Sequence, residues 1–238
     1  MHPEVEVFTD PHALVSVAAE RVVRAAEAAV ERRGRFTIAL SGGRPPRPLY
    51  ELLGGPLRDR VPWERTEIYF GDERCVPPSH PESNFAAARH ALLGYVPLAR
   101  VHRIEGELPP ERAAANYDAT LRAAFPDDLA PTFDVVLLGV GPDGHTASLF
   151  PGGAALDVRD RWAVAVPTPT TVAPHVPRVT VTLPPLERAR EVWFLATGAD
   201  KRDVLRRVLD GDGAGLPAAR VHGALRTTWL IDRAAHGE

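Results

Sequence analysis

Apolar and polar residues alternate with two different periods along this chain. After Asp10-Pro11, a favourable cap and first-turn pair, apolar residues recur every three or four positions until Gly34, which predicts a long helix over residues 11–33. Similar reasoning predicts four more helices: from near Pro48, over residues 84–93, from Pro109-Pro110 to about Phe125, and from Lys201 to about Leu209.

Short apolar runs separate these helices and predict strands at residues 36–40, 67–70, 100–104, 133–138, 163–166, 178–183, 191–196 and 228–231. Because strands and helices alternate along most of the chain, we expect an α/β fold with a mostly parallel sheet flanked by helices. A small antiparallel subregion is expected around residues 163–183. The connections are short and no linker stands out, so residues 1–238 are expected to form a single domain.

Four unusual loops follow predicted strands. They are Ser41 to Arg44, Asp72 to Arg74, Gly139 to His145, and Gly198 to Lys201. Ligands of open α/β sheets bind outside the carboxyl ends of the strands, so these loops are expected to meet at one site.

The loop at residues 139–145 carries the strongest chemical signal. Three glycines within six positions let the backbone turn sharply, and they place Asp143 and His145 at the tip of the turn. We expect His145 to lie near a helix start, where the helix dipole favours the neutral imidazole that a general base needs. Asp143 is expected to orient that base. The alternative is an Asp–His pair that only caps the turn.

Two further loops suit an anion. Ser41-Gly42-Gly43, placed before a helix, offers free backbone N–H groups, although a simple tight turn would look the same. Lys201 is the only lysine, since 27 of the 28 basic residues are arginine, and a bound anion would offset its unfavourable place in a first helical turn. The alternative for Lys201 is a solvated pair with Asp200 or Asp203.

Two known phosphate- and nucleotide-binding motifs are excluded. The loop at Ser41 lacks the Gly-Lys-Ser/Thr ending of a Walker loop. Gly139, Gly141 and Gly144 have the spacing of a dinucleotide fingerprint, but Pro142-Asp143 and His145 fill the tight turn and no acidic residue closes a following strand. Asp72-Glu73 is interpreted as a helix cap in preference to a second acidic partner.

Composition narrows the function further. A net charge of −3 gives no reason to expect nucleic-acid or membrane binding, and no apolar run approaches the roughly 18 residues that span a bilayer. Cys75 is the only cysteine and the nine histidines are scattered, so we expect no metal. The N-terminus does not look like a signal peptide. We expect a cytoplasmic protein that is a monomer or a weak homodimer.

Together these segments resemble the 6-phosphogluconolactonase family. The residues that carry the resemblance are Ser41-Gly42-Gly43, Gly71-Asp72-Glu73-Arg74, Ser83-Asn84, the string from Gly139 to Pro151, Arg178-Val-Thr, Gly198 to Lys201, and Trp229 to Asp232. The resemblance implies a Rossmann-like α/β fold shared with glucosamine-6-phosphate deaminases. It also implies hydrolysis of 6-phosphoglucono-δ-lactone, in the oxidative pentose phosphate pathway, without a cofactor.

The resemblance also implies roles for single residues. The catalytic set would be His145 as the base, Asp143 beside it, and Arg74 at the substrate site. The substrate- and phosphate-binding set would be Ser41, Gly42, Gly43, Arg44, Asp72, Arg178 and Lys201. One departure concerns Arg44-Pro45-Pro46, which stands where the family usually has Ser-Thr-Pro, so a hydroxyl contribution is missing there.

Two other functions fit parts of the pattern. Amino-sugar phosphate deaminases resemble this chain at Asp143-Gly144-His145 but continue with a Glu that serves ring opening, and Phe150 occupies that position here. A non-catalytic sugar-phosphate sensor usually carries a helix-turn-helix, for which the first predicted helix leaves no room. Binding of 6-phosphogluconate without turnover of the lactone would distinguish a sensor from an enzyme.

Overall fold

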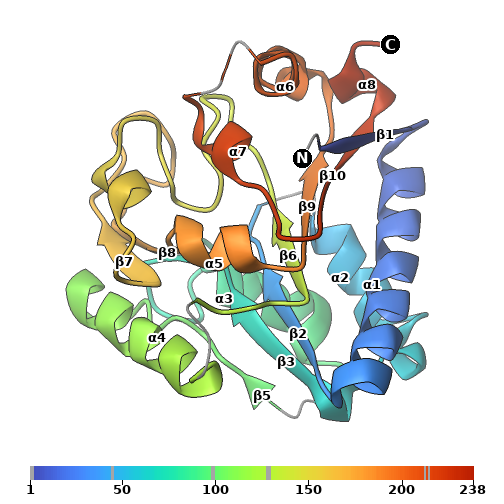
Figure 1. Cartoon of the computed structure of the whole chain (residues 1–238), viewed down its shortest axis with the longest axis horizontal. Coiled ribbons are helices and arrows are strands. Elements are labelled where there is room, and N and C mark those ends of the chain that lie inside the picture. Colours follow the sequence, from blue (N-terminus) through green and yellow to red (C-terminus); the bar gives the residue numbers. More distant parts are fainter. Residues whose placement is uncertain (1–2, 44–45, 98–99, 127–129, 212, 214) are drawn as a thin grey trace.

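The computed structural model describes residues 3–43, 46–97, 100–126, 130–211, 213 and 215–238 (Figure 1). Its strands are β1 (Glu4–Phe8), β2 (Phe36–Leu40), β3 (Thr66–Phe70), β4 (Asp72–Arg74), β5 (Arg100–Val101), β6 (Val135–Leu138), β7 (Ala163–Val166), β8 (Arg178–Val181), β9 (Glu191–Ala196) and β10 (Arg226–Asp232). Its helices are α1 (Pro11–Arg33), α2 (Pro46–Gly54), α3 (Asn84–Ala88), α4 (Pro110–Ala124), α5 (Leu183–Arg188), α6 (Arg202–Leu209), α7 (Pro217–Arg220) and α8 (Arg233–His236).

Seven parallel strands form the main sheet, in the order β1-β10-β9-β6-β2-β3-β5. Figure 1 shows α1 on one side of this sheet and α5 on the other. A second sheet is antiparallel and has the order β4-β8-β7. The expected α/β class is confirmed, and so is the antiparallel subregion, to which β4 adds a strand from a distant part of the sequence.

The first helix forms where the sequence predicts it. The Asp10 carboxylate accepts a hydrogen bond from Ala13 N at 2.9 Å, Pro11 occupies the first turn, and Gly34 ends the helix in the left-handed region at φ +73°. One face of α1 is buried against the sheet, including Leu14 and Val22. The helix therefore has both a local start and stop signal and an apolar face to bury.

Several elements differ from the expectation. Strand β1 was not predicted. It is an edge strand beside β10, and its Val5 and Val7 side chains are exposed. Strand β5 has two residues instead of five. The strand expected to end at residue 183 ends at Val181, since α5 begins at Leu183 with prolines in its first turn, where no N–H partner is needed. The helix over residues 84–93 continues past α3 as a π-helical turn.

Buried strands fix the geometry of the sheet. Every residue of β2, β3 and β6 is buried. Between β9 and β10, the rings of Phe194 and Trp229 are cross-strand partners and stack at 3.9 Å with an interplanar angle of 4°. Because the strands are packed in this way, their carboxyl ends hold the loops that follow them in fixed positions.

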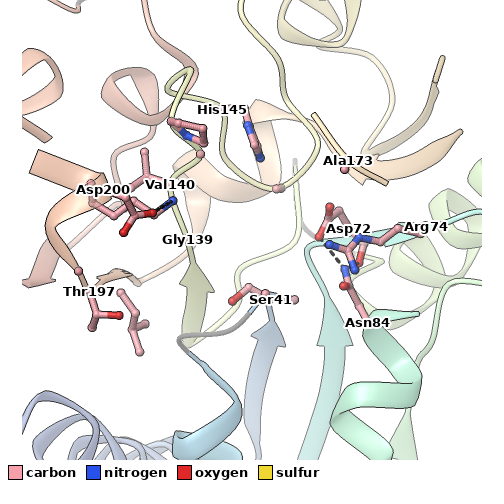
Figure 2. Close-up of a pocket in the computed structure, with 18 of the residues that line it drawn as sticks. Ser41, Asp72, Arg74, Asn84, Gly139, Val140, His145, Ala173, Thr197 and Asp200 are labelled. Carbon is pink, nitrogen blue, oxygen red and sulfur yellow. Dashed lines mark hydrogen bonds and ion pairs between the residues drawn. The ribbon is translucent and has the colours of Figure 1, made fainter. Parts of the chain in front are cut away.

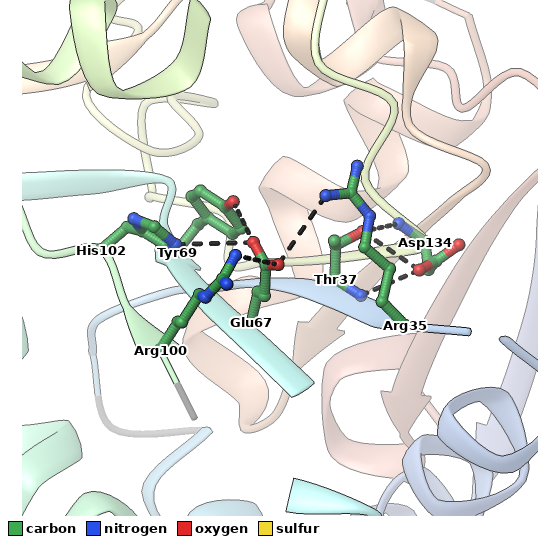
Figure 3. Close-up of polar contacts among 7 residues, drawn as sticks. All are labelled: Arg35, Thr37, Glu67, Tyr69, Arg100, His102 and Asp134. Atoms are coloured by element: carbon green, nitrogen blue, oxygen red, sulfur yellow. Dashed lines mark hydrogen bonds and ion pairs between the residues drawn. The ribbon is translucent and has the colours of Figure 1, made fainter. Parts of the chain in front are cut away.

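Two buried carboxylates tie the strands together near their amino ends (Figure 3). Asp134 accepts hydrogen bonds from Thr37 N at 2.8 Å and Arg33 Nη2 at 2.7 Å. Glu67 accepts one from the Tyr69 hydroxyl at 2.8 Å, and His102 Nε2 lies 3.5 Å from its Oε2. The contact with His102 is the largest cause that lowers the pKa of Glu67, to about 2, although burial opposes it.

Replacing Glu67 with Gln is expected to lower the free energy of unfolding by about 1–3 kcal/mol at pH 7. Because folding lowers the pKa of Glu67 from its ordinary 4.5, the stabilisation is complete above pH 4.5 and is lost as the pH falls towards 2. Urea unfolding at pH 7 and pH 3 measures this, and the difference between wild type and variant should shrink at pH 3. An equal difference at both pH values would contradict the attribution of this stabilisation to the ionised Glu67 carboxylate.

Candidate active site

The loops that leave the carboxyl ends of β2, β3, β6 and β9 surround one cavity of about 600 Å³ (Figure 2). The residues lining it that the sequence had singled out are Ser41, Gly42, Gly43, Asp72, Arg74, His145, Arg178 and Lys201. Asp143 lies behind His145, and Arg44 lies outside the described residues. The expected meeting of the four strand-end loops is therefore confirmed.

His145 is held from behind by a carboxylate. Its Nδ1 lies 2.5 Å from Asp143 Oδ1, and its backbone N donates to the same oxygen at 3.2 Å. Burial raises the pKa of Asp143, but its contacts with His145 outweigh burial and leave the pKa below 3.8. An ionised carboxylate only accepts hydrogen bonds, so Nδ1 carries the proton and Nε2 is the basic nitrogen of the neutral ring.

The prediction that a helix starts near His145 is wrong. Residues 141–153 form turns, closed by Gly141 N donating to His145 O and Gly144 N donating to Gly141 O, both at 2.9 Å. No helix dipole acts on the ring through its own segment. The neighbours of the imidazole are Asp143 and the Phe150 ring, whose centroid lies 4.8 Å away. Contact with these two groups therefore sets the orientation of the base.

Gly141 leaves room for the imidazole. A Cβ at this position would lie 2.0 Å from His145 Nδ1 and 2.8 Å from Asp143 Oδ1. We expect Gly141→Ala to displace the ring and reduce turnover by about 10²-fold, because a catalytic base must sit within hydrogen-bond reach of its proton. Steady-state kinetics measure this.

Gly215→Ala is the matched control, since a Cβ at Gly215 meets no atom within 4 Å. We expect it to keep the wild-type rate. If the Gly141 variant were equally active, the loop geometry would not matter for turnover.

Asp72 joins two walls of the cavity. Its carboxylate is 6% exposed and accepts from Ser148 Oγ at 2.6 Å and from Asn84 Nδ2 at 3.0 Å. Asp72 thereby links β4 to the loop of His145 and to the start of α3. Of these partners, Asn84 also lines the cavity, and its Oδ1 is buried without a partner among the described residues, as is Ser41 Oγ. Both atoms belong to residues that line the cavity.

Glu73 caps a helix that begins eleven residues later. Its carboxylate accepts from Asn84 N at 2.7 Å, from Phe85 N at 2.8 Å and from the Ser83 hydroxyl at 3.0 Å. Burial is the largest influence and raises the pKa of Glu73. The cap interpretation therefore fits Glu73 and fails for Asp72, because residues 72–74 form a strand and start no helix.

Among the residues that the structure describes, three cations line the cavity. Arg74 and Arg178 are cross-strand partners in the small sheet, and burial lowers the pKa of Arg178. Their Nε atoms are buried without partners among the described residues. Lys201 comes from the loop after β9, is 19% exposed, and its Nζ lies 3.7 Å from Asp200 Oδ2. The Lys201–Asp200 ion pair, which was the alternative to an anion-binding role for Lys201, is therefore present, and it lies at the cavity wall.

No cluster of three or more His, Cys, Asp or Glu within the described ranges could hold a metal ion. Among the helices that the structure describes, none is long and apolar enough to cross a membrane.

Residues 9–229 match the family model described as glucosamine-6-phosphate isomerases/6-phosphogluconolactonase. The chain belongs to this family. It is 40% identical to a 6-phosphogluconolactonase of Streptomyces coelicolor over 98% of this chain and 93% of that protein. It is 41% identical to one of Rattus norvegicus over 97% of this chain and 91% of that protein.

Solved structures of the family have the same fold. The 6-phosphogluconolactonase of Thermotoga maritima superposes with a TM-score of 0.84 at 31% identity, covering 97% of this chain and 99% of that one. A monomeric glucosamine-6-phosphate deaminase shares the fold alone, with a TM-score of 0.80 at 17% identity over 98% of this chain and 99% of that one. The family thus includes two chemistries on one fold, and the residues of the cavity must distinguish them.

Outside the predicted loops, sequence reasoning gave no site role to five residues that line the cavity: Asn84, Ala147, Ala173, Leu195 and Thr197. The sequence does offer a signal for Asn84, since this residue stands in the Ser83-Asn84 motif at a predicted helix start. It offers no signal for Ala173, because the long segment before β8 reaches the cavity only through tertiary packing.

Proposed function

We propose that this protein hydrolyses 6-phospho-D-glucono-1,5-lactone to 6-phospho-D-gluconate, a step of the oxidative branch of the pentose phosphate pathway. One observation carries the proposal. A histidine whose Nδ1 is held by a carboxylate faces the same cavity as three cations. Such a cavity suits a substrate with a dianionic phosphate at one end and a base-sensitive ester at the other.

Binding depends on the phosphate. Lys201, Arg178 and the backbone N–H groups of Gly42 and Gly43 bind the 6-phosphate, as charge-assisted donors do at phosphate sites. This contact fixes the lactone carbonyl near His145. Binding energy from the phosphate, which takes no part in the reaction, is thereby used to orient the carbonyl carbon.

The chemical step uses a single base. His145 Nε2 removes a proton from water as the water oxygen attacks C1, and the carbonyl oxygen becomes an oxyanion. When the C1–ring oxygen bond breaks, the protonated His145 donates that proton to the departing ring oxygen. Atoms and charge balance without a cofactor, and the products are a carboxylic acid, which ionises, and a hydroxyl group.

Arg74 is the favoured donor to the oxyanion. Three N–H groups of the glycine loop, those of Gly141, Gly144 and His145, already donate within the loop. Arg74 Nη1 donates to Glu82 O at 2.7 Å, which holds the guanidinium, and Nη2 has no hydrogen-bond partner among the described residues, so it can donate to a ligand. A positioned cation at a developing oxyanion lowers the barrier because it needs no reorganisation.

Phe150 argues against the deaminase chemistry. Its ring packs on His145 at 4.8 Å and contributes no carboxylate that could open a sugar ring. The test is a pair of assays on the wild-type protein. Fresh lactone should be hydrolysed well above the spontaneous rate, and glucosamine 6-phosphate should release no ammonia. Ammonia release, or binding of 6-phosphogluconate without lactone turnover, would refute the proposal.

We also propose that the protein acts as one domain spanning residues 1–238, in the cytoplasm, as a monomer or weak homodimer. Its small-molecule substrate is then its only required partner, with no nucleic acid or membrane involved. The modest net charge of −3 supports the proposal that neither nucleic acid nor a membrane is a partner.

A further inference from the structure

Asp232 is a buried carboxylate behind the cavity wall. It is the last residue of β10 and is 2% exposed. Its Oδ1 accepts from Gly198 N at 3.0 Å and from Ala235 N at 2.9 Å, and its Oδ2 lies 3.2 Å from Gly198 N. One carboxylate thus joins the loop after β9 to the first turn of α8.

The sheet brings Asp232 to this place. Strands β9 and β10 are parallel and Ala196 is the partner of Ile231, so the chain after Ala196 leaves the sheet beside Asp232. Gly198 then adopts φ +95° and ψ 150°, a conformation that residues with a Cβ rarely adopt. Its N–H needs an acceptor, and Asp232 supplies it.

The position of Gly198 determines that of Lys201. Lys201 N donates to Gly198 O at 3.1 Å, which closes a single 3₁₀ turn over Ala199–Lys201. Thr197, Gly198, Asp200 and Lys201 all line the cavity from this turn. A shift of Gly198 would therefore move the lysine, since one turn of backbone connects them.

We propose that Asp232 is a positioning residue that fixes the Gly198–Lys201 turn, and with it the Lys201 ammonium, at the cavity. Its effect on catalysis rests on the proposed function, in which Lys201 binds the substrate phosphate. A carboxylate suits the task because it only accepts hydrogen bonds and two N–H groups converge on it. Asparagine would keep one accepting oxygen and turn an NH₂ group towards the other contact.

The first readout is chemical labelling of Lys201, which is the only lysine of the chain. The Nζ is only partly accessible, with the side chain 19% exposed. In Asp232→Ala, reductive methylation of the Lys201 peptide, followed by mass spectrometry, should be at least about threefold faster, because the turn opens locally. Asp232→Asn should fall between that variant and wild type, and it also serves if the alanine variant does not fold.

The second readout is a double-mutant cycle in the lactonase assay. Asp232→Ala alone should raise KM about 3–10-fold with little change in kcat, as expected for a weakened charge-assisted contact. In a Lys201→Ala background the same substitution should change KM less than about twofold. Asp134→Ala is the matched control, since it removes a buried carboxylate at the opposite end of the strands and should lower Tm without changing KM.

The outcomes separate the two proposals. Unchanged labelling of Lys201 in both Asp232 variants would overturn the positioning role, and so would equal effects on KM in both backgrounds. If Lys201→Ala leaves KM unchanged while the Asp232 variants still accelerate labelling, Asp232 does position the turn, and it is the phosphate-binding role of Lys201 that fails.

Discussion

Replacing His145 with alanine is expected to lower kcat for the lactone about 10²–10⁴-fold, the contribution of a well-placed general base. Asp143 orients the imidazole at the cavity, and the Phe150 ring packs against it. Initial rates with freshly prepared lactone, after subtraction of spontaneous hydrolysis, measure the effect.

His222→Ala is the control for this substitution. His222 is exposed and does not line the cavity, so its loss should leave the rate within about twofold of wild type. If His145→Ala retained activity within a few-fold of wild type, His145 would not be the base.

Replacing Lys201 with alanine is expected to raise KM about 10–100-fold while kcat changes only a few-fold. A hydrogen bond between charged groups contributes about 1.5–3 kcal/mol, and a contact made equally in the bound substrate and in the transition state affects KM and not kcat. Steady-state kinetics separate the two constants. Lys201→Arg should give an intermediate KM, because a guanidinium keeps the charge but not the compact shape of the ammonium.

Arg206→Ala tests whether net charge alone explains such an effect. Arg206 is exposed on α6, and its replacement removes the same charge from the same segment without touching the cavity. We expect KM to stay within about twofold of wild type. A loss of kcat with unchanged KM in Lys201→Ala would contradict the phosphate-binding role.

Much of the fold follows from local patterns. The cap at Asp10, the apolar face of α1 and the stop at Gly34 all lie close together in sequence, so they predict that helix accurately. The four strand-end loops could also be predicted from the sequence, because glycines and charged residues follow buried apolar runs. Parallel strands then bring those loops to one edge, which places most of the predicted site residues in one cavity.

What the sequence could not predict depends on long-range contacts. Strand β4 looks like a loop until it pairs with β8, more than 100 residues later. The π-helical end of α3 and the absence of a helix after His145 are set by packing and by hydrogen bonds across turns. Asp232 stood in a recognised motif, yet its bond to Gly198 appears only when β9 and β10 lie side by side.

The central claim is that the cavity holds a phosphorylated lactone with its carbonyl at His145. The most direct measurement compares kcat/KM for 6-phospho-D-glucono-1,5-lactone with kcat/KM for the same lactone without its phosphate, on the wild-type protein. We predict a preference of about 100-fold or more for the phosphorylated lactone, because several charge-assisted contacts are lost without the phosphate. Equal turnover of the two lactones, or turnover of neither, would contradict the claim.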